Sequence, residues 1–161
     1  MILIAYDGSE DAKAAIEQAG KLFQGQNATV VTVWQRFVDT MVRLGGGVGV
    51  IVDYDEIDAS SEQSALERAT EGAQLAVSAG LKADGRSLVV ESSIDAAILT
   101  EAAKIDAAVV VLGSRGYTGV KSMMLGSVSA RVLHHADRPV LVVPSPAVTE
   151  ARAKELHPTA P

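Results

Sequence analysis

The chain has 161 residues and a formal net charge of -6, and a chain of this length is expected to form one domain that buries about 68–70% of its unfolded surface. It contains no cysteine, which excludes disulfides, thiolate catalysis and cysteine-based zinc sites and favours a cytoplasmic protein. The acidic balance argues against a nucleic-acid partner, and because no apolar run reaches about 18 residues we expect neither a membrane span nor a signal peptide.

Apolar runs and helical periodicity alternate along the chain. Strands are predicted at residues 2–6, 28–34, 86–91, 107–112 and 140–143. Helices are predicted after the first strand, over 55–79, over 94–105 and from residue 126. This alternation indicates a parallel sheet, because each right-handed crossover between parallel strands needs a helix to return the chain.

Polar residues and glycines mark where these helices should begin and end. Asp7-Gly8-Ser9-Glu10 offers an N-cap, so Asp7 is interpreted either as that cap or as a carboxylate that faces a ligand. Ser92 or Ser93 is expected to cap the helix over 94–105, and Gly80 is expected to end the helix before it. Charged residues of the 55–79 helix are expected to face solvent: Glu62, Glu67, Arg68 and Glu71.

Two segments carry no clear pattern. Nothing regular is expected from Gln35 to Asp53, where the glycine-rich stretch 45–49 interrupts any periodicity. A loop of this length is either a mobile cover over a ligand or a plain insertion. Residues 145–161 are expected to form a mobile tail, with a short helix over 149–156 as the alternative.

The stretch after the fourth strand holds features that suit an anion. The strand over 107–112 runs into Gly113-Ser114-Arg115-Gly116, and Gly119 and Gly126 follow before a helix. Glycine accepts positive φ and lets backbone amides approach a ligand closely. The helix begins at Gly126-Ser127-Val128-Ser129, where Ser127 or Ser129 is expected to cap while the first amides remain available to an anion. Residues 113–139 are also locally basic, with Arg115, Lys121, Arg131 and Arg138 against Asp137.

Other kinds of site are poorly supported. The chain lacks G-x-x-x-x-G-K-[ST], and no G-x-G-x-x-G follows the first strand, which argues against a P-loop NTPase and a typical dinucleotide dehydrogenase. His134 and His135 are adjacent on a helix and point about 100° apart, so a favourable position at the helix C-terminus is expected rather than a shared metal. No nucleophile with its base is evident, so no catalytic residue is predicted, and the hydroxyls of Ser127 and Ser129 are expected to bond phosphate.

The glycine spacing carries a resemblance to a known family. Gly113-x2-Gly116-x9-Gly126-Ser127 resembles the ATP-binding signature of the universal stress protein family, in its nucleotide-binding branch. The family also typically opens with a strand that ends in Asp-Gly-Ser, here at 7–9, and closes with the pattern found at 138–144. The resemblance covers residues 1–144, which are taken as one adenine-nucleotide-binding domain. Many relatives have glycine where Ser92-Ser93 stands, so the backbone at this corner is expected to differ from theirs.

The resemblance implies a fold and an assembly. It implies a Rossmann-like α/β domain, with an open five-stranded parallel sheet of order 3-2-1-4-5 and helices on both faces. Strands 1 and 4 then lie side by side at the topological switch point, and ligands of such sheets bind beyond the carboxyl ends of the strands there. It also implies a homodimer that forms through the strand Val140–Val143.

The resemblance further implies a regulatory or sensing module of the stress response that binds ATP, or else AMP or ADP. Mg²⁺ or Mn²⁺ would bridge the phosphate oxygens, with few protein carboxylates available to it. A slow ATPase or phosphotransferase and a nucleotide-free dimeric scaffold remain alternatives. In the implied site Ala5, Tyr6 and Asp7 border the nucleoside, and the backbone of Val33 meets the adenine edge. Leu112 and Gly113 line the ribose side, and the phosphates are surrounded by Arg115, Gly116, Gly126, Ser127, Val128 and Ser129.

Overall fold

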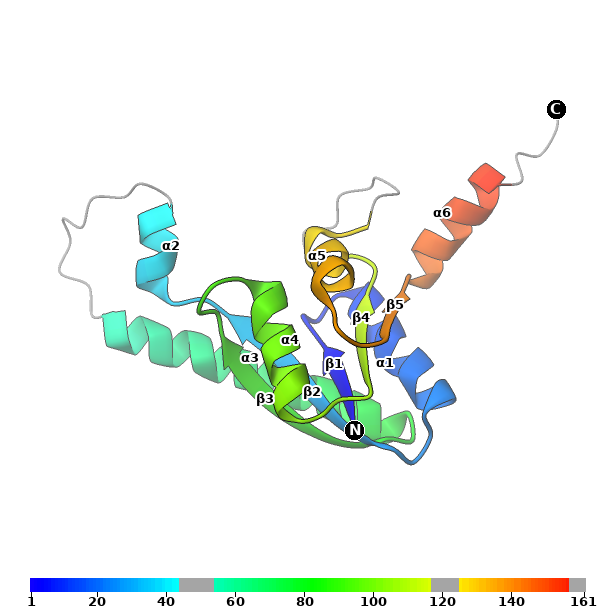
Figure 1. The fold of residues 1–161 in the computed structure, drawn as a ribbon, viewed down its shortest axis with the longest axis horizontal. Helices are drawn as coiled ribbons and strands as arrows, with labels where there is room; N and C mark the ends of the chain where they lie inside the picture. Colours follow the sequence, from blue (N-terminus) through cyan, green and yellow to red (C-terminus); the bar gives the residue numbers. More distant parts are fainter. Residues whose placement is uncertain (44–53, 117–124, 157–161) are drawn as a thin grey trace.

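The computed structural model describes residues 1–43, 54–116 and 125–156 as a parallel sheet with helices on both faces (Figure 1). The sheet is five-stranded and has the order β3-β2-β1-β4-β5. Its strands are β1 (Ile2–Ala5), β2 (Asn27–Trp34), β3 (Lys82–Val89), β4 (Val109–Gly113) and β5 (Val140–Val143). The predicted fold class and strand order are confirmed.

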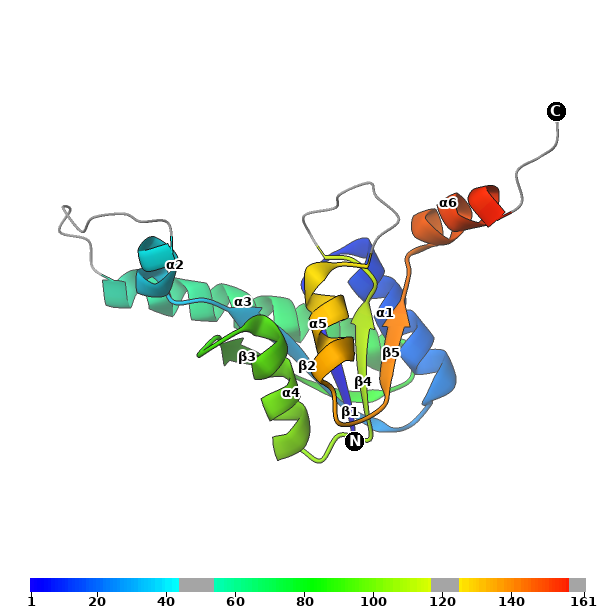
Figure 2. The ribbon, with the colours of Figure 1, turned by 45° about the horizontal axis from the view of Figure 1, so that its top comes forward.

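Four helices complete the two outer layers, as Figure 2 shows: α1 (Glu10–Leu22) and α3 (Tyr54–Ser78) on one face, α4 (Ile94–Lys104) and α5 (Ser127–His135) on the other. Successive strand residues point to opposite faces, so Ile4 packs with Ile16 of α1 while Leu3 packs with Ile98 of α4 and Val132 of α5. Each of these side chains is almost fully buried, which contributes about 1.5–3 kcal/mol apiece. Burial on both faces explains why β1 and β4 are continuous apolar runs in the sequence.

The third strand begins at Lys82, so its predicted start at residue 86 was wrong. Asp84-Gly85 has the composition of a turn, yet both residues lie in the ladder with β2. Gly85 provides space for α3, because a Cβ there would lie 2.7 Å from the carbonyl oxygen of Ala69. The close packing of α3 on β3 therefore keeps Gly85 in the strand, although its local sequence is typical of a turn.

A short helix, α2 (Phe37–Arg43), occupies part of the segment in which nothing regular was predicted, so that prediction was wrong for these residues. Contacts from α3 hold it in place. The Phe37 N–H donates to Asp58 Oδ1 at 2.7 Å, and the Phe37 ring stacks on Tyr54 with centroids 6.0 Å apart. The glycine-rich stretch 45–49 lies outside the described residues.

The C-terminal segment contains a helix, α6 (Pro146–Leu156), which leads away from the sheet after β5 (Figure 1). It starts earlier than the predicted alternative at residue 149, because Pro146 suits a first helical position and the Thr149 N–H donates to Ser145 O at 3.0 Å. Ser145 and Val148 are buried at its base. Among the helices of the described ranges, none has the length and apolar character needed to cross a membrane.

Candidate functional site

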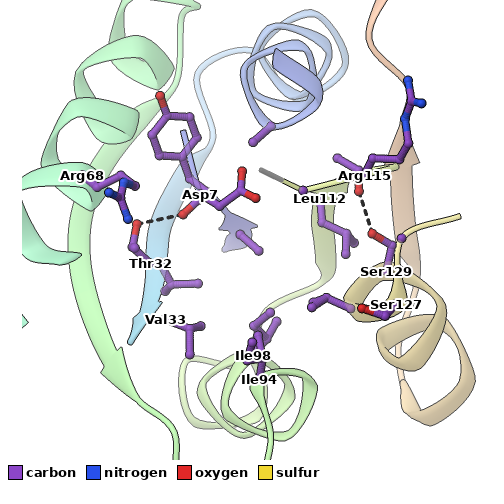
Figure 3. A pocket seen from close by; sticks show the side chains of 18 residues that line it. Asp7, Thr32, Val33, Arg68, Ile94, Ile98, Leu112, Arg115, Ser127 and Ser129 are labelled. Carbon is purple, nitrogen blue, oxygen red and sulfur yellow. Dashed lines mark hydrogen bonds between the residues drawn. The ribbon is translucent and has the colours of Figure 1, made fainter. Parts of the chain in front are cut away.

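A cavity of about 400 Å³ lies at the carboxyl ends of β1, β2 and β4, at the predicted topological switch point (Figure 3). The strands β1 and β4 pair directly here, with Ala5 opposite Leu112. Every residue that the sequence suggested for the site lies in its wall: Ala5, Tyr6, Asp7, Val33, Leu112, Gly113, Arg115, Gly116, Gly126, Ser127, Val128 and Ser129.

The turn from β1 to α1 places the Asp7 carboxylate in the cavity wall. Ser9, not Asp7, caps α1, because the Ala12 N–H donates to Ser9 Oγ at 3.2 Å. Asp7 Oδ1 accepts the Ser9 N–H at 3.0 Å, and Oδ2 lies beside Gly116, where an added Cβ would be 2.8 Å away. Of the two interpretations of Asp7, the cap is wrong, and the carboxylate borders a space large enough for a ligand.

The N-terminus of α5 opens on the opposite wall and lacks a side-chain cap. Gly126 is the N-cap residue and makes no side-chain capping bond, so the predicted capping by Ser127 or Ser129 was wrong. The Ser129 hydroxyl is buried and donates to Gly113 O at 2.7 Å (Figure 3). The first amides of a helix have no partner within it and lie at the positive end of its dipole. This wall therefore provides N–H groups that suit an anion.

The glycines of this wall provide space rather than positive φ. Among the described glycines, positive φ occurs only at Gly8, Gly25 and Gly80, and Gly126 has φ -61. The positive φ that glycine permits is therefore not used at Gly116 or Gly126. A Cβ on Gly126 would lie 3.2 Å from Ser114 O and from Arg115 Cα, and a Cβ on Gly116 would enter the space beside Asp7.

Asp11 holds the start of the loop that follows β4, a role that sequence reasoning missed. The residue is only 6% exposed. Its Oδ2 accepts the Ser114 hydroxyl at 2.7 Å and the Arg115 N–H at 3.1 Å, and lies 3.8 Å from Arg115 Nε. The sequence showed an acidic residue in the first turn of α1, but nothing local indicated a partner more than one hundred residues away.

The basic residues of 113–139 do not gather around the cavity as predicted. Arg115 lines it. Arg131 Nε instead pairs with Asp95 Oδ1 at 2.9 Å, and Arg138 pairs with Asp137 and donates to the carbonyl oxygens of Ala102 and Ala107. Lys121 lies outside the described residues. An anion at this wall would thus meet backbone amides and Arg115 more than a basic cluster.

The other end of the cavity is largely apolar, and sequence reasoning missed most of its residues. Ile94 and Ile98 of α4 face it, opposite β2 (Figure 3). The sequence predicts them only as part of the buried stripe of a helix, because helical periodicity does not distinguish a core residue from one that lines a cavity. The remaining residues that the sequence did not suggest are Ala12, Val31, Thr32 and Arg68.

Strand register directs the peptide of Val33 to this end. The β1–β2 ladder ends at Ala5 and Val31, after which the Tyr6 N–H donates to Val31 O at 2.9 Å. The Thr32 hydroxyl then donates to Tyr6 O at 2.8 Å (Figure 3). Because backbone groups alternate in direction along a strand, the N–H and C=O of Val33 face the same side as those of Val31. They therefore face the cavity where β1 has turned away.

Tyr6 and Arg68 connect the cavity to α3. The Tyr6 hydroxyl donates to Glu71 Oε1 at 3.0 Å, and burial, followed by this bond and the charge of Glu71, raises the pKa of Tyr6 to about 12. Arg68 is exposed, as expected, and its side chain also lines the cavity (Figure 3).

The adjacent histidines lie at the far end of α5. His135 Nδ1 is 3.0 Å from Asp95 Oδ2, so this ring connects α5 to α4, and its edge contacts His134 with centroids 4.9 Å apart. Within the described ranges, no group of three or more His, Asp or Glu side chains is placed to hold a metal ion.

Comparison with known proteins identifies the class. The universal stress protein family matches residues 1–144. The chain is 32% identical over 145 residues to the universal stress protein YxiE of Bacillus subtilis, covering 88% of this chain and 97% of that protein. It therefore belongs to the universal stress protein family.

Solved structures share the fold. The hypothetical protein MJ0577 superposes with a TM-score of 0.69 at 21% identity, over 89% of this chain and 94% of that one. A universal stress protein from Archaeoglobus fulgidus in complex with dAMP gives a TM-score of 0.55 at 23% identity, over 88% and 95%. A universal stress protein in complex with cAMP gives 0.60 at 19% identity, over 89% and 96%.

Proposed function

We propose that this protein is an ATP-binding regulatory or sensing module of the stress response, acting in the cytoplasm as a homodimer. The observation that carries the nucleotide assignment is the cavity at the switch point, which joins an apolar end to a helix N-terminus whose N-cap residue is a glycine. A nucleotide has the same two halves, a flat base and a chain of anionic phosphates. The solved relatives with dAMP and cAMP support an adenine nucleotide as the ligand class.

The apolar end fits a purine. Ile94 and Ile98 cover one side, and Leu112 and Val33 lie beside them. The peptide of Val33 faces this space with one donor and one acceptor, a pair that matches the edge of adenine. In this proposal Asp7 accepts a hydrogen bond from the nucleoside next to the Gly116 backbone.

The opposite end fits the phosphates. The amides of residues 127–129 and the Arg115 side chain would hold them, while Asp11 keeps the loop in position. Gly116 leaves volume for a phosphate chain, since a side chain there would enter the space beside Asp7, and Gly126 lets the start of α5 approach the backbone of Ser114 and Arg115. Mg²⁺ or Mn²⁺ would neutralise clustered phosphate oxygens.

Gly116→Val tests the proposal most directly. Its side chain would displace the Asp7 carboxylate and occupy the phosphate approach, so ATP binding should be lost while the fold persists. In the wild type, ATP at one hundred times its dissociation constant should stabilise the fold by about 2.7 kcal/mol, a melting shift of roughly 5–11 °C. Thermal titration with Mg²⁺-ATP on both proteins, with circular dichroism as the check on folding, provides the measurement.

The same samples separate a binder from an enzyme. No serine at the α5 terminus has a base beside it among the described residues, since the Ser129 hydroxyl bonds to Gly113 O. We expect very slow phosphate release. A turnover number of about 1 s⁻¹ or more that disappears in Gly116→Val would identify an ATPase instead. An unshifted wild-type melting curve at millimolar ATP would contradict nucleotide binding and favour a scaffold.

A further inference from the structure

We propose that Arg68 of α3 stacks its guanidinium on the base of the bound nucleotide and so strengthens nucleotide binding, an inference that rests on the proposed nucleotide site. Arg68 lies on the β2 side of the cavity, with its guanidinium beside Thr32 (Figure 3). Arg115, Ser127 and Ser129 lie across the cavity from it. Its position therefore suits the base and not the phosphates.

Packing places the Arg68 side chain. The α3 face that carries Ala65, Ala69 and Gly72 is buried against the sheet, so the backbone of Arg68 is held at the edge of that face. The aliphatic stem lies over the β1–α1 turn, where a Cβ on Gly8 would be 3.6 Å from Arg68 Cδ and 3.7 Å from Nε. The residue is exposed, so its guanidinium remains accessible to a ligand.

Charge around Arg68 also disfavours a phosphate contact. The negative charges of Glu71 and Asp7 raise the pKa of the Tyr6 phenol at this end of the cavity, and the positive charge of Arg68 lowers it. A phosphate placed here would meet two negative groups, whereas the neutral face of a base would not. The acidic neighbours therefore disfavour a phosphate at this end and leave the phosphates to the α5 terminus.

In this proposal, side chains from the helix layers on the two sides of the sheet cover opposite faces of the base. Arg68 belongs to the helix layer of α1 and α3, while Ile94 and Ile98 belong to the layer of α4 and α5. A planar ring that enters beyond the strand ends is thus covered by aliphatic side chains on one side and by a planar cation on the other. Arginine stacks on such rings through its delocalised plane, which lysine lacks.

The experiment measures ATP affinity by calorimetry for the wild type, Arg68→Ala, Arg68→Lys and Arg36→Ala, at about 0.1 and about 0.5 M salt. Arg36 is exposed and does not line the cavity, so Arg36→Ala removes the same charge elsewhere. We expect Arg68→Ala to weaken ATP binding about 3- to 30-fold, from the usual strength of cation–π contacts. The loss should persist at high salt, Lys should restore little of it, and Arg36→Ala should bind as the wild type does.

Equal affinity of Arg68→Ala and the wild type would overturn the inference while leaving the nucleotide site intact. A loss that shrinks at high salt and is restored by Lys would also overturn it, because that pattern indicates a screened contact with phosphate. A wild type that binds no ATP would instead refute the proposed function itself, and this inference with it. Thermal unfolding without ligand verifies that each variant is folded.

Discussion

The phenol of Tyr6 links the first strand to α3 and gives the protein a pH-dependent contact. Only 2% of Tyr6 is exposed, and its hydroxyl donates to Glu71 Oε1. Burial and the neighbouring carboxylate raise the pKa of this phenol from its ordinary 10.0 to about 12. The folded protein therefore holds the proton more tightly than the unfolded chain does, and stability must depend on pH in the alkaline range.

We predict that the free energy of unfolding falls as the pH rises from about 10 to about 12, because the unfolded chain releases the proton first. Below pH 10 this contribution is fully present. Tyr6→Phe removes the phenol and should lose this part of the alkaline decline. Urea unfolding of both proteins at pH 8 and pH 11 gives the comparison, and equal declines in the two would contradict the assignment.

Single residues differ in how far the sequence predicts them. The cavity residues on the β1 and β4 ends follow a spacing along the chain, so the motif could indicate residues that line one cavity. Asp11 and Arg68 follow no such spacing, because their roles depend on segments that are distant in the sequence. Asp11 accepts a hydrogen bond from Ser114, and Arg68 lines the cavity together with residues of β2. A helix pattern shows which residues avoid the core, but not how far a long side chain at the edge of the buried face reaches.

At the scale of elements, Asp95 joins the two helices that cover one face of the sheet. It lies in the first turn of α4 and is 4% exposed, yet it contacts Arg131 and His135 of α5 at 2.9 and 3.0 Å. Burial alone would raise its pKa, but hydrogen bonds from Ser93 and His135 and the charge of Arg131 bring the pKa below its usual value. The carboxylate is thus stabilised in its charged form.

Asp95→Asn should therefore destabilise the protein at pH 7 by about 1–3 kcal/mol, the usual effect of losing a buried charged hydrogen-bond partner. Because the pKa is lowered, the contribution is present above about pH 4 and is lost as the pH falls through the lower folded value. The difference between variant and wild type should shrink at pH 3. Denaturant unfolding at the two pH values tests this, with Asp137→Asn as an exposed acidic control; a constant difference would contradict it.

Helices and strands with a clear apolar periodicity in their own sequence were predicted well. Those whose structure depends on contacts with other elements were not. The helix α4 has a stripe that includes Ile98 and Ala102, and β5 has its predicted bounds. The helix α2 is too short to show a period, and its contact with Asp58 of α3 decides its structure. Likewise β3 continues through Gly85 because α3 packs there, which no local pattern reveals.

At the scale of the whole molecule, β5 is an edge of the sheet and offers a surface for a second copy of the chain. The ladder with β4 uses the carbonyl oxygens of Pro139 and Val143, which accept the N–H groups of Val110 and Ser114 at 3.0 and 2.7 Å. By alternation, the peptide groups of Leu141 also face β4, and those of Val140 and Val142 face outward. The proposed homodimer would pair these outward groups across a two-fold axis.

Two prolines on β5 should consequently behave differently. Val142→Pro removes an outward N–H and should give a folded monomer, since proline is tolerated at a free edge. Leu141→Pro removes an N–H of the β4 ladder and should destabilise the fold itself. Val142→Ala keeps the N–H and should remain a dimer, which separates backbone pairing from side-chain packing. Light scattering after gel filtration at about 10 µM, with thermal unfolding of each variant, distinguishes these cases. A monomeric wild type, or a dimeric and folded Val142→Pro, would show that the copies do not associate through β5.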